Sequence, residues 1–246
     1  MPRTSTGIQV ISRASAILRE VAANPDGLSL GQLAKATGLA RSTVQRIVDA
    51  LEVEYFVQAG AGGVRPGWGL RRLGEQAGPG AARELRPQLY RLFESTHETV
   101  DLSTLAGCEV LFLDRFISDQ RIRAVPEIGM HYPAYTMANG KALLAGLNND
   151  EVLALYEHGA LERMTPNSLA DIDLLIAQLN VIRAGGFAYD IEEHTLGSCA
   201  IGIPVCTKPT FQLAISVVVP TVRFESQRAA IEQALLLCAK ECQARL

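Results

Sequence analysis

The stretch SLGQLAKATGLARSTVQRIVDALE, residues 29–52, decides how the N-terminal part of this chain folds. Ser29 stands where a short helix takes a side-chain cap, and Gly38 stands where that helix ends and positive φ is tolerated. After a turn of about three residues, a second helix over residues 41–53 is predicted by apolar side chains that recur at helical spacing, namely Val44, Ile47, Val48 and Leu51. The stretch therefore predicts a helix-turn-helix.

The second helix carries the side chains expected to read DNA. Its N-terminal part is polar and contains Arg41, Ser42, Thr43, Gln45 and Arg46. Arginine bonds guanine bidentately, glutamine bonds adenine, and hydroxyl groups and a helix N-terminus bind phosphates. An ordinary helical hairpin with solvated polar residues is the alternative that the spacing leaves open.

The flanking segments complete a winged helix-turn-helix. Residues 8–22 have the periodicity of an amphipathic helix. YFVQAGAGGVRPGWGL, residues 55–70, predicts two short strands around a Gly-rich turn, which resembles a wing. Arg65 near the tip is expected to contact the DNA backbone or minor groove, with a plain surface hairpin as the alternative. Trp68 is expected to pack within the wing.

A Gly-Pro-Gly break at residues 78–80 divides the chain. With 246 residues, of which 48% are hydrophobic and 20% charged, the chain has room for two globular domains. We expect a DNA-binding domain over residues 1–76, a linker helix over residues 77–98 that tolerates Pro87, and a third region over residues 99–246.

The region over residues 99–246 predicts an α+β fold with a mainly antiparallel sheet. A hairpin is expected over residues 99–116, turning at Ala106 and Gly107, and a second strand pair over residues 198–207 and 211–219. Helices fit residues 139–147, 149–159, 168–185 and 224–246, the third starting at Ser168. Lys141 is expected at the surface, and Arg121 and Arg123 alternate along an expected strand.

Charge, hydropathy and cysteine usage bound the class of protein. Residues 1–76 contain nine Lys/Arg and six Asp/Glu, a net of +3, so the remainder of a chain with net charge -3 carries -6. A basic segment on an acidic body favours a polyanionic partner for the first domain. No apolar run approaches the ~18 residues of a membrane span, so a cytoplasmic location is expected. Five cysteines argue against a disulfide framework, and Cys238 and Cys242 are expected on a partly buried helical face.

The stretch YDIEEHTLGSCAIGIPV, residues 189–205, concentrates reactive side chains. An enzyme or metal site would use Asp190, Glu192, Glu193, His194 and Cys199 as base, nucleophile or ligands. The metal-binding patterns H-E-x-x-H and paired C-x-x-C do not occur. A thiol redox sensor at Cys199 or Cys206 is a third alternative, but the acidic surroundings disfavour a thiolate. We expect a binding function, with no catalytic residue, metal or cofactor.

The order of motifs resembles the IclR family of bacterial transcriptional regulators. The resemblance rests on the helix-turn-helix stretch, on YTMANGKALLAGL at residues 135–147, on IRAGGFAYDIEEHTLG at residues 182–197 and on GIPV at residues 202–205. It implies a winged helix-turn-helix, a linker helix and a GAF-like effector domain. It also implies a dimer or tetramer that binds a pseudo-palindromic promoter site, and a small organic or aromatic acid as effector.

The resemblance further implies which side chains line the effector pocket. They are Arg121, Ala124, Met130, Ala138, Asn139, Asp190, Ala200, Ser216 and Val218. At Ala200 and Val218 this chain lacks the Cys and Ser side chains that many relatives carry, which makes the expected pocket more apolar. This departure favours a larger or aromatic acid over a small keto acid. Control of a neighbouring catabolic operon is also implied, whereas the sign of regulation is not.

Overall fold

The computed structural model describes residues 9–76, 80–124, 132–156, 161–208 and 211–246. The chain forms two compact units, residues 1–80 and 81–246. The sequence placed a linker helix over residues 77–98. The helix found there, α5 (Ala81–Thr96), contributes Leu85, Leu89 and Leu92 to the core of the second unit.

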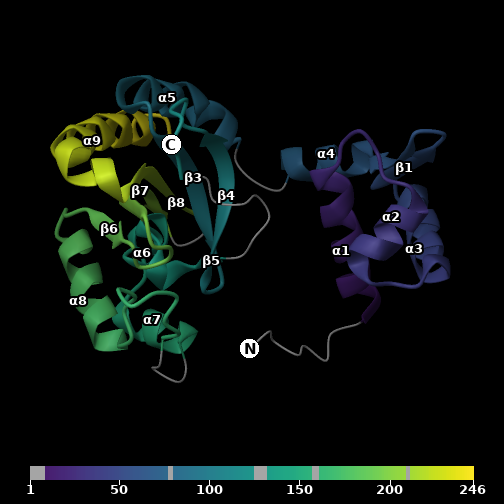
Figure 1. Ribbon diagram of the computed structural model, residues 1–246, viewed down its shortest axis with the longest axis horizontal. Coiled ribbons are helices and arrows are strands. Elements are labelled where there is room, and N and C mark those ends of the chain that lie inside the picture. The colour runs from purple at the N-terminus through teal and green to yellow at the C-terminus, as the bar shows by residue number, and fades with distance from the viewer. Residues whose placement is uncertain (1–8, 77–79, 125–131, 157–160, 209–210) are drawn as a thin grey trace. The chain divides into compact units, whose positions relative to one another are not determined.

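The first unit is a helix-turn-helix with a two-stranded wing (Figure 1). Its elements are α1 (Gln9–Ala23), α2 (Leu30–Thr37), α3 (Arg41–Val53), β1 (Val57–Gly60), β2 (Gly63–Pro66) and α4 (Trp68–Gln76). One cluster holds the three-helix core and the wing together, with Ile17 and Val21 of α1, Leu33 of α2, Val44 and Val48 of α3, and Val57 and Val64 of the wing among its buried members. The apolar spacing of α2 and α3 therefore faces a single core, as the sequence predicted, whereas Ile11 at the start of α1 is exposed.

Local chemistry fixes the turn between α2 and α3. Ser29 Oγ accepts a hydrogen bond from the Gln32 amide at 3.3 Å, and Gln32 Oε1 accepts one from the Ser29 amide at 2.8 Å, which completes a capping box. Gly38 ends α2 with φ 67°, a conformation that glycine adopts at little cost. Both predictions for this turn are confirmed.

The wing differs from the expectation at its C-terminal end. β1 and β2 pair antiparallel from Val57 opposite Pro66 to Gly60 opposite Gly63. The chain then enters α4, a helix that the sequence did not predict because its two glycines and two arginines leave few apolar side chains. Trp68 begins α4 and is 73% exposed, so the expectation that it packs within the wing is wrong.

The second unit is built on one six-stranded antiparallel sheet with the order β5-β4-β3-β8-β7-β6. Its strands are β3 (Thr99–Ala106), β4 (Glu109–Phe116), β5 (Tyr132–Pro133), β6 (Ala188–Ile191), β7 (Ser198–Lys208) and β8 (Phe211–Pro220). Long central strands are joined by the hairpins that the sequence predicted, β3 to β4 and β7 to β8. The α+β class with an antiparallel sheet is confirmed.

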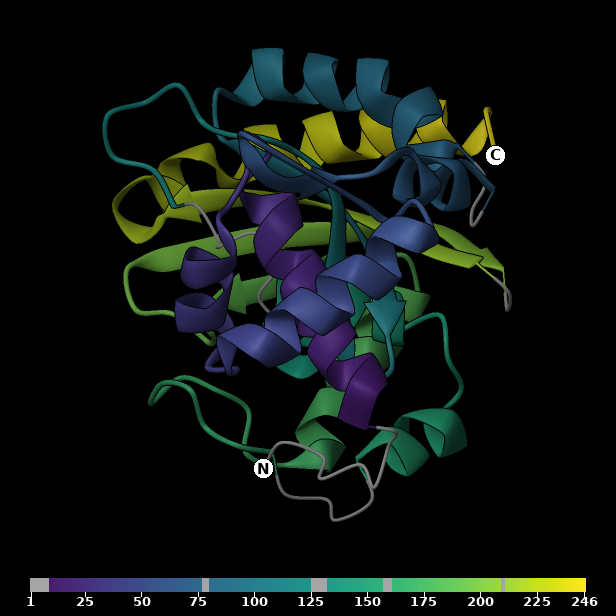
Figure 2. The ribbon, with the colours of Figure 1, turned by 90° about the vertical axis from the view of Figure 1, so that its right-hand side faces the viewer.

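Helices cover both faces of this sheet. α5 and α9 (Thr221–Gln243) lie side by side on one face (Figure 2). The other face carries the short helix η1 (Ala134–Thr136), α6 (Ala138–Leu144), α7 (Asn149–Leu155) and α8 (Ile172–Arg183). Along β7 the side chains alternate, because Cys199 and Ile201 belong to the α5/α9 core while Ala200 belongs to a cluster with Ala138 of α6.

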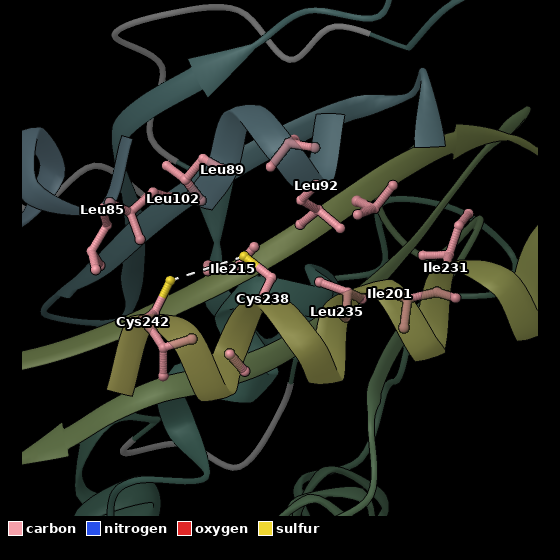
Figure 3. Close-up of a cluster of buried hydrophobic side chains, with 14 of the residues drawn as sticks. Leu85, Leu89, Leu92, Leu102, Ile201, Ile215, Ile231, Leu235, Cys238 and Cys242 are labelled. Atoms are coloured by element: carbon pink, nitrogen blue, oxygen red, sulfur yellow. Dashed lines mark hydrogen bonds between the residues drawn. The ribbon is translucent and has the colours of Figure 1, made fainter. Parts of the chain in front are cut away.

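Figure 3 shows the core between the sheet and the helices α5 and α9. Leucines of α5 meet Ile231 and Leu235 of α9 over the strands. Cys238 and Cys242 lie in this core with their sulfur atoms 3.9 Å apart, and the Cys238 thiol donates to the Gln88 carbonyl of α5. The pair is more deeply buried than the expected half-buried face.

Three local expectations for the second unit are wrong. α8 begins at Ile172 with Asp171 as its cap, because Ser168 accepts hydrogen bonds from the amides of Met164 and Thr165 and so caps a separate turn. Arg121 and Arg123 lie in an irregular segment and not in a strand. Strands β5 and β6, which are too short to give a period-two signal, were missed.

Gly202 allows α6 to lie against β7. A Cβ added at this position would stand 2.7 Å from the carbonyl carbon of Ala138 and 3.0 Å from the backbone nitrogen of Asn139. Both are backbone atoms, which cannot move without displacing the first turn of α6. The absence of a side chain here therefore fixes the distance between α6 and the sheet.

We expect Gly202→Ala to lower the free energy of unfolding of the second unit by about 1–3 kcal/mol, because the methyl group forces α6 away from β7. Denaturant unfolding followed by circular dichroism measures this change. Gly80→Ala is the matched control, since a Cβ added there meets no atom within 4 Å. Equal stabilities of the two variants would contradict the close packing.

Candidate functional site

The candidate DNA-binding surface lies on the N-terminal half of α3. Among the residues predicted for this role, four are exposed and one is half-buried: Arg41, Ser42, Gln45 and Arg46 are exposed, and Thr43 is half-buried. No side chain caps α3 at Ala40, which leaves the first amide groups of the helix to solvent or to an anion. The surface therefore combines donors for bases with donors for phosphate.

Two of these side chains stand next to the wing. Arg41 and Gln45 line a surface depression together with Ala59, Gly60 and Ala61 of the wing tip. The Gln45 amide donates to Asp49 Oδ1 at 2.6 Å, one turn along the helix. A base contact by Gln45 would exchange this internal hydrogen bond for one to DNA.

Arg65 has a structural partner within the first unit. Its Nε donates to the Asp26 carbonyl at 3.0 Å, and its guanidinium lies over Gly62, where an added Cβ would stand 2.6 Å from a terminal nitrogen. Arg65 therefore ties the wing to the loop before α2. Its other N–H groups are the ones that a DNA backbone would meet.

The second candidate site is a cavity of about 250 Å³ on the α6 side of the sheet. An irregular segment, the helix α6 and the four strands β5, β6, β7 and β8 all contribute to its wall. The described lining consists of Ala124, Tyr132, Met137, Ala138, Asn139, Asp190, His194, Thr195, Ser198, Ala200, Ser216 and Val218. Four of the lining side chains are small and apolar, and seven carry polar groups, three of which come from β6 and the turn after it.

Seven of the nine residues assigned to the pocket from the sequence line this cavity: Ala124, Ala138, Asn139, Asp190, Ala200, Ser216 and Val218. Arg121 is exposed and is not part of the wall, and Met130 lies outside the described residues. Sequence reasoning missed Tyr132, Met137, His194, Thr195 and Ser198. Of these, Ser198 could have been predicted, because it lies two residues before Ala200 on the same strand and so faces the same side. Tyr132 could not, because it lies on strand β5, which the sequence did not predict.

Asp190 is the acidic group of the cavity and is only 5% exposed. Its Oδ1 accepts hydrogen bonds from the Glu193 amide at 2.8 Å and the His194 amide at 3.4 Å. Burial raises the pKa of the Asp190 carboxyl to about 7, and these two amides and the Lys141 ammonium oppose the shift. Near neutral pH the group is therefore divided between its acid and carboxylate forms.

Two further polar groups complete the wall. Asn139 is 1% exposed, its Oδ1 accepts from the Gly140 amide at 2.9 Å, and its Nδ2 has no acceptor among the described residues. Ser216 on β8 is buried opposite Gly202 of β7. His194 packs edge-on against the Tyr132 ring with centroids 5.0 Å apart, and burial lowers the pKa of its imidazole.

The reactive cluster identified in the sequence is dispersed by the fold. Glu192, at φ 57°, turns its carboxylate to the Gly197 amide and the Thr221 hydroxyl. Glu193 turns to Lys141, and Cys199 lies on the opposite face of the sheet from Asp190. Burial also raises the pKa of the Cys199 thiol, which disfavours the thiolate that a redox sensor needs.

One serine of the first unit lies in a sequence pattern that also occurs in hydrolases. Residues 27–31, GLSLG, match the G-x-S-x-G pattern of hydrolases. The pattern requires a strand before the serine and a helix after it, with the hydroxyl free to attack. Here Ser29 follows a loop, and its hydroxyl caps α2 and donates to Gln32 Oε1 at 2.7 Å. Ser29 therefore has a capping role in this fold.

Lys141 is fully buried, so its expected surface position is wrong. Its Nζ donates to Glu193 Oε1 at 2.6 Å and to Gln178 Oε1 at 2.9 Å. The lysine projects from α6, whose residues are all buried. Its surface position was inferred only from its place near a helix start. The pair joins α6 to the turn that holds Asp190.

We expect Lys141→Met to lower the free energy of unfolding by about 3–5 kcal/mol, because it leaves the Glu193 carboxylate buried without a cation. The double variant Lys141→Met/Glu193→Gln removes both charges and should cost less than the sum of the two single variants. Chemical denaturation of all four proteins measures the coupling. Additive costs would show that the two charges do not stabilise each other.

Stability should depend on pH through Asp190. The folded-state pKa of about 7 exceeds the ordinary value of 3.8, so the fold favours the protonated acid and loses stability as pH rises from 4 to 7. We expect Asp190→Asn to gain stability relative to the unsubstituted chain between pH 5 and pH 8, by at most about 4 kcal/mol. Asp101, whose pKa burial raises to about 6, contributes equally to both proteins. A stability difference that is constant with pH would contradict the buried acid.

The described residues contain no group of three or more His, Cys, Asp or Glu side chains that could hold a metal ion. Within the same residues, no helix is long and apolar enough to cross a membrane.

Known proteins share both units of this chain. Residues 80–244 match the family described as bacterial transcriptional regulator IclR C-terminal, and residues 10–60 match the IclR helix-turn-helix domain. HTH-type transcriptional regulator Rv1719 of Mycobacterium tuberculosis is 41% identical over 234 residues, which cover 94% of this chain and 90% of that protein. HTH-type transcriptional regulator TtgV of Pseudomonas putida is 40% identical over 232 residues, which cover 94% and 88% of the two chains.

Solved structures share the fold. The IclR protein of Thermotoga maritima superimposes with a TM-score of 0.73 at 24% identity and covers 97% of this chain and 98% of its own. An IclR homolog of Microbacterium hydrocarbonoxydans, solved in complex with 4-hydroxybenzoate, has a TM-score of 0.79 at 19% identity, with 96% and 98% of the chains covered. The first unit is a helix-turn-helix, the second is built on an antiparallel sheet, and known family members match both. This chain therefore belongs to the IclR family of bacterial transcriptional regulators.

Proposed function

We propose that this regulator binds promoter DNA through α3 and that a small organic molecule, bound in the cavity of the second unit, changes that binding. The observation that carries the proposal is the pairing of a helix-turn-helix, whose exposed side chains suit base edges, with a separate unit that encloses a cavity. Neither feature alone implies regulation by a ligand, and the family supplies the connection between them.

The DNA-binding proposal assigns roles by chemistry. Arg41 and Gln45, beside the wing, contact base edges in the major groove. Ser42, Thr43, Arg46 and the first amides of α3 contact phosphates, and Arg65 meets the backbone beside the wing. The phosphate contacts make affinity fall with salt, and the base contacts set the preferred sequence.

The effector proposal rests on the composition of the cavity. Its volume of about 250 Å³ exceeds the roughly 150 Å³ of an apolar cavity that holds benzene. Small side chains leave room for a flat ring, and a few convergent polar groups fix its orientation. The complex of a family homolog with 4-hydroxybenzoate supports an aromatic ligand for this fold.

The remaining roles follow the family. A homodimer or tetramer in the cytoplasm would match a pseudo-palindromic operator, and control of a neighbouring catabolic operon would relate the effector to its degradation. We assign no catalytic activity, because the reactive side chains of residues 190–199 face three separate sets of partners.

We expect Arg41→Ala and Gln45→Ala each to weaken binding to the specific promoter site by about 1–3 kcal/mol while leaving nonspecific binding less affected, because each loses a base contact. Titration of labelled operator and scrambled DNA at several salt concentrations measures both affinities. Arg163→Ala, which removes an exposed arginine from the second unit, is the charge-matched control. Unchanged affinity and sequence preference in both α3 variants would refute the assignment.

A further inference from the structure

The described wall of the cavity offers no Lys or Arg side chain to an acidic ligand. None of the described residues that line it is Lys or Arg, and the segment 125–131, VPEIGMH, contains neither in its sequence. Lys141, the nearest buried cation in α6, is committed to Glu193 and Gln178. A carboxylate in this cavity would be buried without an opposite charge, which is strongly unfavourable.

The start of α6 does not supply the missing positive charge. α6 has only seven residues, and its Gly140 amide already donates to Asn139 Oδ1. The first turn is also pressed against Gly202, where even a Cβ has no room beside the Asn139 backbone nitrogen. The start of α6 therefore offers no free amide geometry for a carboxylate.

Two polar atoms in the cavity wall lack a hydrogen-bond partner among the described residues, and they differ in kind. Asp190 uses Oδ1 for the turn amides, and its Oδ2 receives no hydrogen bond among the described residues. Asn139 Nδ2 is a donor without an acceptor in the same part of the chain. A hydroxyl group satisfies both atoms at once, because it donates one hydrogen bond and accepts another.

The rest of the wall suits an aromatic ring. Ala124, Ala138, Ala200 and Val218 form a cluster of small apolar side chains on one side of the cavity. The Tyr132 and His194 rings, packed edge to face, offer a further aromatic surface. Because burial lowers the pKa of His194, that ring is neutral near pH 7 and provides no countercharge.

We propose that the effector is an uncharged aromatic molecule with a hydroxyl group, which donates to Asp190 Oδ2 and accepts from Asn139 Nδ2. This inference rests on the proposed function, in which the cavity is the effector site. It replaces the expected organic acid with a phenol-like ligand. Asp190 thus acts as a specificity-determining residue that accepts a hydroxyl and disfavours a carboxylate.

Three matched ligands test the inference: 4-methylphenol, toluene and 4-methylbenzoate, which share a ring and differ in one substituent. Isothermal titration of the full-length protein at pH 7.5 and constant salt measures the dissociation constant for each. We expect 4-methylphenol to bind at least tenfold tighter than 4-methylbenzoate and about fivefold or more tighter than toluene. Tighter binding of 4-methylbenzoate would overturn the inference and leave the cavity as effector site.

Substitutions in the cavity wall test which residues cause the preference for 4-methylphenol. Asp190→Asn keeps an oxygen for the turn amides but removes the acidic group, so we expect the preference for 4-methylphenol over 4-methylbenzoate to fall by about tenfold. Asp173→Asn, an exposed position on α8, is the control and should leave the preference unchanged. An unchanged preference in both Asn139→Ala and Asp190→Asn would overturn the inference.

A variant with a filled cavity distinguishes a failure of this inference from a failure of the proposed function. Ala124→Phe fills the cavity from an irregular segment and keeps the backbone carbonyl that accepts from Thr99, so the fold is retained. It should abolish binding of all three ligands and any effect of 4-methylphenol on operator affinity. Binding that survives Ala124→Phe, or no binding by any of the three, overturns the inference. The operator titration with the α3 variants decides the DNA-binding role independently.

Discussion

The buried ion pair between Lys141 and Glu193 is the constraint on which the effector unit depends. Two charges removed from water cost several kcal/mol each unless they meet, so their contact at 2.6 Å fixes α6 against the turn that follows β6. That turn also places the amides of Glu193 and His194 on Asp190. The position of the cavity acid is therefore set by a pair that does not itself line the cavity.

The sheet supplies a second constraint by separating two functions onto its two faces. The side facing α5 and α9 is filled with apolar side chains. The side facing α6 carries small or polar groups, including Ala200, Gly202, Ser216 and Val218, along the central strands β7 and β8. Because successive residues alternate between faces, one strand sequence encodes a dense core and a cavity wall together.

Much of the fold was predictable where local signals agree. The capping residue Ser29, the turn glycine Gly38 and the apolar spacing of α3 each predict the helix-turn-helix independently. The long strands β7 and β8 are predicted by their β-branched residues. Short elements were not predictable in this way. β5 has two residues and β6 has four, and both depend on pairing with partners distant in sequence.

The candidate site shows the same division between local and nonlocal information. Motif resemblance assigned Asn139, Asp190 and Ala200 to a pocket, and all three line the cavity. Motif resemblance could not predict that Lys141 is buried and Arg121 exposed, because both depend on how α6 and residues 117–124 lie on the sheet. The errors therefore concerned charged residues: Arg121 was placed in the pocket and is exposed, and Lys141 was placed at the surface and is buried.

This charge arrangement has a consequence for selectivity. An apolar pocket alone distinguishes ligands weakly, since an added or missing methylene changes binding by only about 1–3 kcal/mol. A buried donor without a partner, Asn139 Nδ2, imposes a larger difference, because a ligand that lacks the matching acceptor leaves it desolvated and unpaired. Asp190 adds a further selection as it ionises, because its negative charge then opposes a carboxylate while still accepting from a hydroxyl. In the effector site that we propose, the buried Asp190 thus selects against a carboxylate with no Lys or Arg among the described lining residues.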